Sequence, residues 1–317
     1  MTDELVQTGA PEEPKHTARW IFVGNDGIRA GWSALIFLAI FIALVFLVAV
    51  PFFTLMHFRV ERGAPQPAYF ALIQEGVMAI LVVLATFIMS RIEKRPVAVY
   101  GYAGKAKFVR FVSGIFWGFA AISLLVGALL KSHLLAFDGS PLGGVPAWRY
   151  AAEWAVAFIL VGIFEESLLR GYLQYTLTRG IGFWWAAIIL SVGFGAIHGS
   201  NPGESPVGLF AAAAVGLVFC LSLWYTGSLW WAIGFHAAWD WGETYFYGTP
   251  DSGMVAAGHL FSEHPTGALL WSGGATGPEG SLLVVPLLVL MVLLMWLWWG
   301  RRVESPFRKR AAMVTES

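Results

Sequence analysis

The chain has 317 residues, of which 57% are hydrophobic and only 13% are charged. Soluble globular domains carry about twice that share of charged residues, so the composition argues against an ordinary soluble protein. The 20 Lys and Arg residues balance the 20 Asp and Glu residues, and a formal net charge of zero gives no reason to expect a nucleic-acid partner. The 16 Trp residues suit a protein that meets membrane interfaces.

Long apolar segments recur along the chain, and segments of about 20 apolar residues are typical of membrane-spanning helices. They predict an all-α, polytopic membrane protein of the cell membrane with eight spans. The fifth span is the shortest. In chain order the predicted spans cover residues 32–56, 69–90, 108–130, 151–173, 183–198, 207–225, 229–246 and 282–299.

The basic residues predict that both termini are cytoplasmic. With that orientation, the predicted outer segments contain only Arg59, Arg62, Lys131 and Arg149, whereas the inner segments hold most of the remaining Lys and Arg residues. The Gly- and Pro-rich loop 247–281 has no Lys or Arg, which suits the outer side.

One membrane-embedded domain over residues 31–300 is predicted, with its site in residues 151–245. A polar, disordered tail over residues 1–30 precedes it, and a basic cytoplasmic tail over residues 301–317 follows.

The first polar cluster inside a span reads Glu165-Glu166-Ser-Leu-Leu-Arg170. A charged side chain at membrane depth costs about 2.5–3.5 kcal/mol even on insertion scales, so its default interpretation is functional. Residues four apart share a helix face, so Arg170 is expected to pair with Glu166. Glu165 is turned by about 100° from Glu166 and stays free to act as a general base.

Two further clusters follow, Phe194-Gly-Ala-Ile-His198 and His236-Ala-Ala-Trp-Asp240. A helical hairpin that turns near residues 180–182 would bring His198 to the depth of Glu165. His236 and Asp240 are one turn apart on their own helix, but His236 follows its preceding turn so closely that reaching the same depth requires a tilted helix.

The polar clusters leave alternatives open. The same side chains could form a packing network or a proton relay in a transporter, or serve an assembly partner. Of the other acids, Glu75 and Glu153 are expected at the membrane interface, while Glu243 lies closer to the clusters. Asn201 is interpreted as a turn residue.

No cofactor is firmly predicted. The zinc-protease motif of two histidines four apart with a glutamate between them is absent. A divalent metal such as zinc could still lie between Glu165, His198 and His236, because Glu and His are zinc ligands. A metal-free site is equally compatible with the residues, with Glu165 and His198 activating water and with His236 and Asp240 binding the oxyanion.

Taken in order, the three clusters resemble the CPBP intramembrane protease family, which includes the type II CAAX prenyl endopeptidases and bacteriocin-processing relatives. The resemblance covers about residues 151–241 and rests on Glu-Glu-x-x-x-Arg, Phe-x-x-x-His and His-x-x-x-Asn or Asp. It implies a helical membrane endopeptidase whose partners are membrane lipid and a membrane-associated or lipidated protein or peptide. By resemblance the catalytic set is Glu165, Glu166, Arg170, His198, His236 and Asp240.

The departure from the prenyl endopeptidases is Asp240, where they have Asn. An amide donates a hydrogen bond to an oxyanion, whereas a carboxylate does so only when protonated. Asp240 is therefore expected either to bind the oxyanion as a neutral acid or to orient a cationic His236, and the second role is favoured. Cleavage of prenylated proteins is less well supported than peptidase activity itself.

Overall fold

The structure is a computed structural model that describes residues 19–59, 64–104 and 106–301, together with residues 305 and 307. Most of the predicted basic tail 301–317 and the first 18 residues of the predicted polar tail 1–30 lie outside the described residues. The remainder of the N-terminal stretch begins with a one-turn helix, α1 (Arg19–Phe22), and an antiparallel pair of two-residue strands, β1 (Val23–Gly24) and β2 (Gly27–Ile28).

Helices make up most of the described chain, and a helix lies at each of the eight predicted spans. The α-helices after α1 are α2 (Ala30–Leu44), α3 (Val50–Leu55), α4 (Ala68–Glu93), α5 (Lys107–Lys131), α6 (Gly144–Glu166), α7 (Gln174–Ile181), α8 (Phe183–His198), α9 (Pro206–Thr226), α10 (Trp230–Trp241), α11 (Leu269–Ser272) and α12 (Val284–Met295). The segments with other helical geometry are η1 (Val45–Ala49), η2 (Val97–Tyr100), η3 (Ser167–Leu173), η4 (Gly242–Tyr247), η5 (Pro278–Gly280) and η6 (Trp296–Gly300).

Length and composition make four of these helical segments long and apolar enough to cross a membrane. They are Ala30–Leu55, Ala68–Glu93, Lys107–Lys131 and Pro206–Thr226. Phe183–His198 and Val284–Gly300 are shorter apolar helices, and the two remaining predicted spans carry the first and third polar clusters. The prediction of a helical membrane protein is thus confirmed, while the number of spans stays a prediction.

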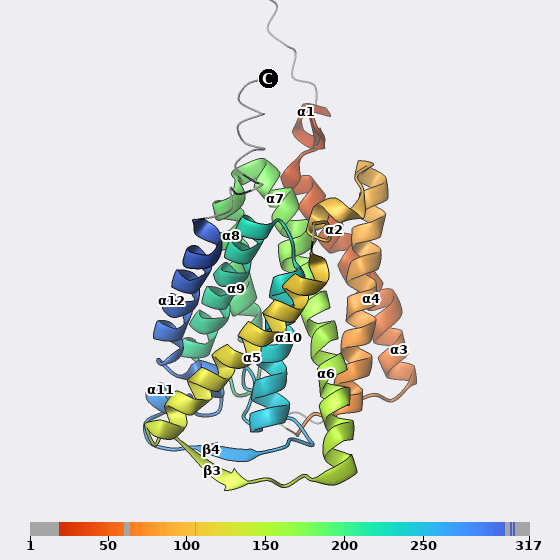
Figure 1. Cartoon of the computed structure of the whole chain (residues 1–317). Coiled ribbons are helices and arrows are strands. Elements are labelled where there is room, and N and C mark those ends of the chain that lie inside the picture. The colour runs from red at the N-terminus through yellow and green to blue at the C-terminus, as the bar shows by residue number, and fades with distance from the viewer. Residues whose placement is uncertain (1–18, 60–63, 105, 302–304, 306, 308–317) are drawn as a thin grey trace, which may run out of the picture.

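Two small antiparallel sheets qualify the predicted all-α class. Besides the β1–β2 pair, β3 (Leu135–Gly139) pairs with β4 (Ser262–Pro265), with Leu135 opposite Pro265. The β3–β4 pair lies at the end of the helical bundle away from α1 (Figure 1). Strands of this kind escaped the sequence analysis because they are short and lie in loops without clear alternation.

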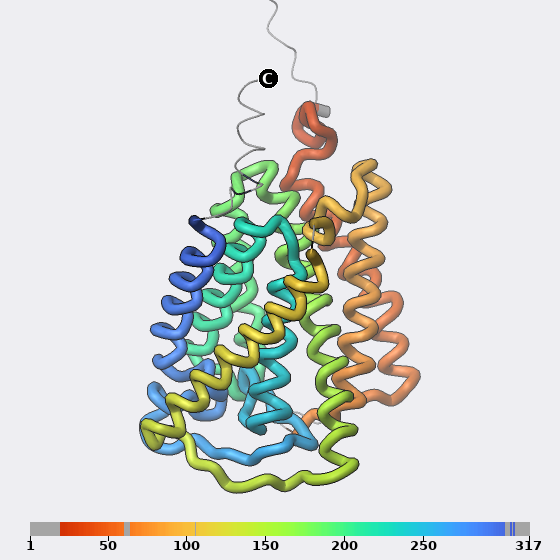
Figure 2. The backbone as a smooth tube through the Cα atoms, viewed as in Figure 1, coloured from red at the N-terminus to blue at the C-terminus, as the bar shows by residue number. Residues whose placement is uncertain are grey.

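The helices pack as an elongated bundle in which α10 lies at the centre, against α5 on one side and α6 on the other. In Figure 2, α5 crosses the bundle obliquely in front of α10, while α4 runs beside α6 and α8 beside α9. The hairpin between the fourth and fifth spans turns where predicted, because α7 ends at Ile181 and Gly182 adopts a φ of +82° before α8.

The crossing of α5 and α10 is very close because glycines face the neighbouring backbone. A Cβ atom on Gly118 of α5 would lie 2.2 Å from the carbonyl oxygen of Phe235, and one on Gly234 of α10 would lie 2.2 Å from that of Phe111. Small residues allow such backbone approach between membrane helices. The crossing fixes α10, the helix that carries the third polar cluster.

Candidate active site

The first polar cluster spans the junction between α6 and η3. Glu165 and Glu166 end α6, and Arg170 lies in η3, a π-helical segment. π-Helical turns inside longer helices are frequent at functional sites. A second π-helical segment, η4, directly follows the His236–Asp240 cluster on α10.

Glu166 and Arg170 form the predicted ion pair. Arg170 Nη1 donates to Glu166 Oε1 at 3.0 Å, and both side chains are fully buried. The guanidinium group also lies over the rings of Phe194 and Phe219, 4.5 Å and 5.6 Å from their centroids. This aromatic contact and the carboxylate together accommodate a buried cation.

His236 lies at the centre of the cluster, where its two ring nitrogens face three carboxylates. Nδ1 lies 3.1 Å from Glu166 Oε1. Nε2 lies 3.6 Å from Glu165 Oε2 and 3.5 Å from Asp240 Oδ2. Each ring nitrogen of His236 therefore faces at least one carboxylate.

His198 approaches the same space from α8. Its Nδ1 lies 2.8 Å from the carbonyl oxygen of Phe194, so this nitrogen carries the hydrogen and Nε2 is the free acceptor. The ring of Phe194 touches His198 edge-on and lies 6.2 Å from the ring of His236. Both histidines line one cavity, so α10 brings His236 to the region that His198 reaches from α8.

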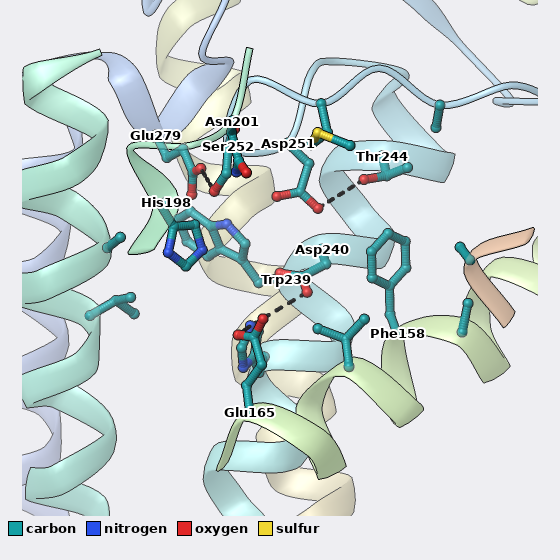
Figure 3. A pocket seen from close by; sticks show the side chains of 18 of the residues that line it. Phe158, Glu165, His198, Asn201, Trp239, Asp240, Thr244, Asp251, Ser252 and Glu279 are labelled. Carbon is teal, nitrogen blue, oxygen red and sulfur yellow. Dashed lines mark hydrogen bonds and ion pairs between the residues drawn. The ribbon is translucent and has the colours of Figure 1, made fainter. Parts of the chain in front are cut away.

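A cavity of about 260 Å³ joins these groups, lined among others by Glu165, His198, His236 and Asp240. Figure 3 shows Glu165 and His198 on opposite sides of the cavity, with Asp240 between the helices that carry them. Glu166 and Arg170 do not line the cavity. Glu166 contacts His236 Nδ1, and Arg170 pairs with Glu166. Of the six predicted site residues, four thus line the cavity, and the other two form a buried ion pair that contacts His236 through Glu166.

The zinc site considered for Glu165, His198 and His236 does not fit this geometry. Among the described residues, these three do not form a group whose ligand atoms all lie within 4.8 Å of one another. Nε2 of His236 faces Glu165 and Asp240, and its Nδ1 faces Glu166.

Three acidic residues at the cavity were not assigned to the site from the sequence. Glu75 on α4 lines the cavity, and its expected place at the membrane interface stays a prediction. Asp251 and Glu279, from the loop after η4, line it as well, and Asn201 donates from Nδ2 to the carbonyl oxygen of Ser252. The one sequence signal was the presence of acidic residues in a loop without Lys or Arg.

The two loop carboxylates lie in an environment that disfavours their charge. Burial, with the neighbouring Glu279 carboxylate as the second cause, raises the pKa of Asp251 to about 8. Burial also raises the pKa of Glu279, against the opposing effect of its hydrogen bond from Ser252. At the end of the cavity that Asp251 and Glu279 line, neighbouring carboxylates therefore repel one another.

Together these features define a membrane-embedded helical protein with a buried Glu–His–Asp cluster. Residues 147–242 match the model of a protein family described as Type II CAAX prenyl endopeptidase Rce1-like. The resemblance inferred from the three motifs is thus confirmed over a stretch that includes all six predicted site residues. No curated protein was found to match the chain.

Proposed function

We propose that the chain is an intramembrane endopeptidase of the cell membrane that hydrolyses a peptide bond with a glutamate-activated water. The observation that carries this proposal is the placement of Glu165 and His198 across one cavity, with His236 beside Glu165. Glu165 Oε2 is buried and forms no hydrogen bond with the described residues, so it is available to bind water.

In the proposed reaction, Glu165 removes a proton from a water molecule that also hydrogen-bonds to His198 Nε2. The hydroxide attacks the carbonyl carbon of the scissile bond. The oxyanion that forms is stabilised by the His236 imidazolium, which Glu166 and Asp240 hold in its cationic form. Glu165 then returns the proton to the leaving amine, the C–N bond breaks, and the carboxylate is restored.

The proposed substrate is a membrane-associated or lipidated protein or peptide. The family match supports this class, since the matched family is described as prenyl endopeptidases. Asp240 lies 3.5 Å from His236 Nε2, a geometry that supports the orienting role over direct hydrogen bonding to the oxyanion. The proposed peptidase activity therefore does not require that the substrate carry a prenyl group.

The test is cleavage of a lipidated reporter peptide by the purified protein. Glu165→Gln keeps the size of the side chain but removes the base, and we expect cleavage to fall by about 100-fold or more. Glu153→Gln is the matched control: Glu153 lies on the same helix, in an ion pair with the exposed Arg149, and should leave cleavage unchanged. Cleavage retained by Glu165→Gln would refute the proposal.

A proton relay in a non-proteolytic membrane protein is the second candidate function. It is favoured by the run of titratable groups along the cavity from Glu75 through Glu165 to Asp251. In proteoliposomes without substrate, a relay predicts a pH-gradient-dependent flux in the parent protein that Glu165→Gln abolishes. An endopeptidase predicts no such flux.

A further inference from the structure

Three carboxyl groups from separate parts of the chain converge next to the cavity. Glu243 lies in η4, Asp251 in the following loop and Glu279 in η5. One oxygen atom from each of the three lies within 4.8 Å of the others. Figure 3 shows Asp251 and Glu279 near the hydroxyl-bearing side chains of Thr244 and Ser252. The cluster thus joins the end of the α10 helix to the loop that covers it.

Glu243 is the residue that needs a ligand. Its side chain is fully buried, and within the described residues only the Trp239 side chain lies near enough to act as a weak donor to its carboxylate. Buried polar groups are almost always paired, and an unpaired buried charge is strongly unfavourable. Within the described chain no Lys or Arg forms an ion pair with any of the three acids, and residues 242–281 contain neither residue type.

The backbone beside Glu243 adds further oxygen atoms. Gly277 has a φ of +108°, and a Cβ atom on it would lie 2.0 Å from the carbonyl oxygen of Pro250 and 3.1 Å from Glu243 Oε1. The absence of a side chain at this glycine therefore lets a carbonyl oxygen and a carboxylate oxygen approach one small volume. The carbonyl oxygen is an acceptor, and an ionised Glu243 carboxylate has no hydrogen to donate to it.

The two outer acids are already oriented by hydroxyl groups. Thr244 Oγ1 donates to Asp251 Oδ2 at 3.1 Å, and Ser252 Oγ donates to Glu279 Oε1. Asp251 keeps its second oxygen for a ligand, while Glu279 also accepts a hydrogen bond from the backbone of Ser252. The donor set consists only of oxygen atoms, which hard cations such as Ca²⁺ and Mg²⁺ prefer over zinc or copper.

We propose that Glu243, Asp251 and Glu279 bind one hard divalent cation of the Ca²⁺ or Mg²⁺ class. The cation ties the 248–281 loop to η4 and relieves the repulsion between the three carboxylates. Because Asp251 and Glu279 also line the cavity, the cation holds the part of the cavity wall that these two residues form. This site is separate from the proposed peptide-cleaving residues and does not depend on their function.

Direct binding is the first test. The full-length protein in detergent is stripped with EDTA, and Ca²⁺ or Mg²⁺ is titrated by calorimetry and in thermal unfolding. A cation that binds only the folded state should raise Tm by about 5 °C when its concentration is about 100-fold above Kd. The two titrations identify which of the two cations is preferred. The absence of binding and of a Tm shift with both cations would overturn the proposal.

The decisive variant is Glu243→Gln, which keeps the shape of the side chain but removes its charge. We expect cation affinity to fall by at least about 10-fold. In EDTA the Tm of this variant should equal or exceed that of the parent protein, because a buried charge has been removed. At saturating cation its Tm should be lower than that of the parent protein, because it binds the cation less tightly. A variant that binds the cation as tightly as the parent would contradict the site.

Two controls keep the result specific. Glu263→Gln removes another partly buried carboxylate from β4, outside the cluster, and should leave cation affinity unchanged. Glu165→Gln should bind the cation normally even where cleavage is lost, which separates this proposal from the proposed function. If Glu243→Gln does not fold, Asp251→Asn replaces it with the same expected loss of affinity.

Discussion

At the scale of single residues, His236 shows how a buried charge is maintained. Glu165, Glu166 and Asp240 surround its ring, and Arg170 balances one of the three carboxylates. The spacing of four residues predicted the pairs Glu166–Arg170 and His236–Asp240, because such residues share a helix face. The contact of His236 with Glu166 was not predictable, since it depends on how α6 and α10 pack.

The first prediction concerns Asp240. In Asp240→Asn the charge that holds His236 cationic is lost, so kcat/KM near neutral pH should fall by about 10- to 1,000-fold. Asp138→Asn is a matched control, because Asp138 also pairs with a histidine, His264, at 2.8 Å but at an exposed position of the β3–β4 sheet. A pH–rate profile of both variants is the measurement. Unchanged or improved cleavage by Asp240→Asn near pH 7 would rule out the orienting role.

The second prediction concerns the buried ion pair. Arg170→Ala leaves Glu166 as an unpaired buried charge, and loss of one partner of such a pair costs about 3–5 kcal/mol. Folded yield and Tm should therefore fall clearly.

The control for Arg170→Ala is Arg149→Ala, which breaks an ion pair of the same spacing between Arg149 and Glu153 at an exposed position. Exposed pairs are worth about 0–1 kcal/mol, so this variant should melt like the parent protein. Equal melting temperatures for Arg170→Ala and the parent would show that the buried pair contributes nothing to stability.

At the scale of elements, the site depends on where α10 lies. Its crossing with α5 brings backbone against backbone at Gly118 and Gly234. The sequence analysis placed both helices as spans, but it could not show which glycines lie at the interface. The apolar residues of a membrane helix surround it on all sides, so no amphipathic pattern marks the face that packs.

The third prediction tests this crossing. Gly118→Ala places a methyl group 2.2 Å from the carbonyl oxygen of Phe235, so α5 and α10 must separate. Overpacking of this kind costs about 1–3 kcal/mol, and because α10 carries His236 and Asp240, cleavage should fall together with Tm.

Gly127→Ala on the same helix is the control for Gly118→Ala, since a Cβ atom there meets nothing within 4 Å. Alanine is the better helix former, so Gly127→Ala should leave Tm unchanged or raise it slightly. Equal Tm values for the two alanine variants would contradict the close crossing.

The π-helical segments and the covering loop were also beyond the sequence analysis. Nothing in Ser167–Leu173 or Gly242–Tyr247 distinguishes a π-helical from an α-helical stretch by periodicity. Asp251 and Glu279 are separated by a turn-rich loop whose path is set by glycines with positive φ rather than by a repeating pattern. Their convergence with Glu243 is therefore a result of tertiary structure alone.

At the scale of the whole molecule, the motifs predicted a candidate site whose residues meet at one cavity, and the apolar segments predicted the helices. Both followed from local rules, namely the helical repeat and the cost of charge in a membrane. The cavity joins residues from α4, α6, α8 and α10 with loop residues between η4 and α12. These residues are so far apart in the sequence that helical spacing cannot predict their contacts. The distribution of Lys and Arg residues along the chain predicts how this cavity is oriented in the membrane.

The last prediction concerns that orientation. The C-terminal end of α4, which carries Arg91 and is followed by Lys94 and Arg95, lies at the end of the bundle near α1 (Figure 1). The loop 248–281 at the opposite end has no Lys or Arg. Because basic segments stay inside, the loop and the mouth of the cavity should face outward.

Cysteine labelling tests the orientation simply, since Cys220 is the one cysteine of the chain and is buried. Ser140→Cys, at the exposed β3 end of the bundle, should react with a membrane-impermeant maleimide in intact cells. Lys94→Cys, exposed at the opposite end, should react only after permeabilisation. The reverse pattern would place the cavity mouth, and the acidic cluster beside it, on the cytoplasmic side.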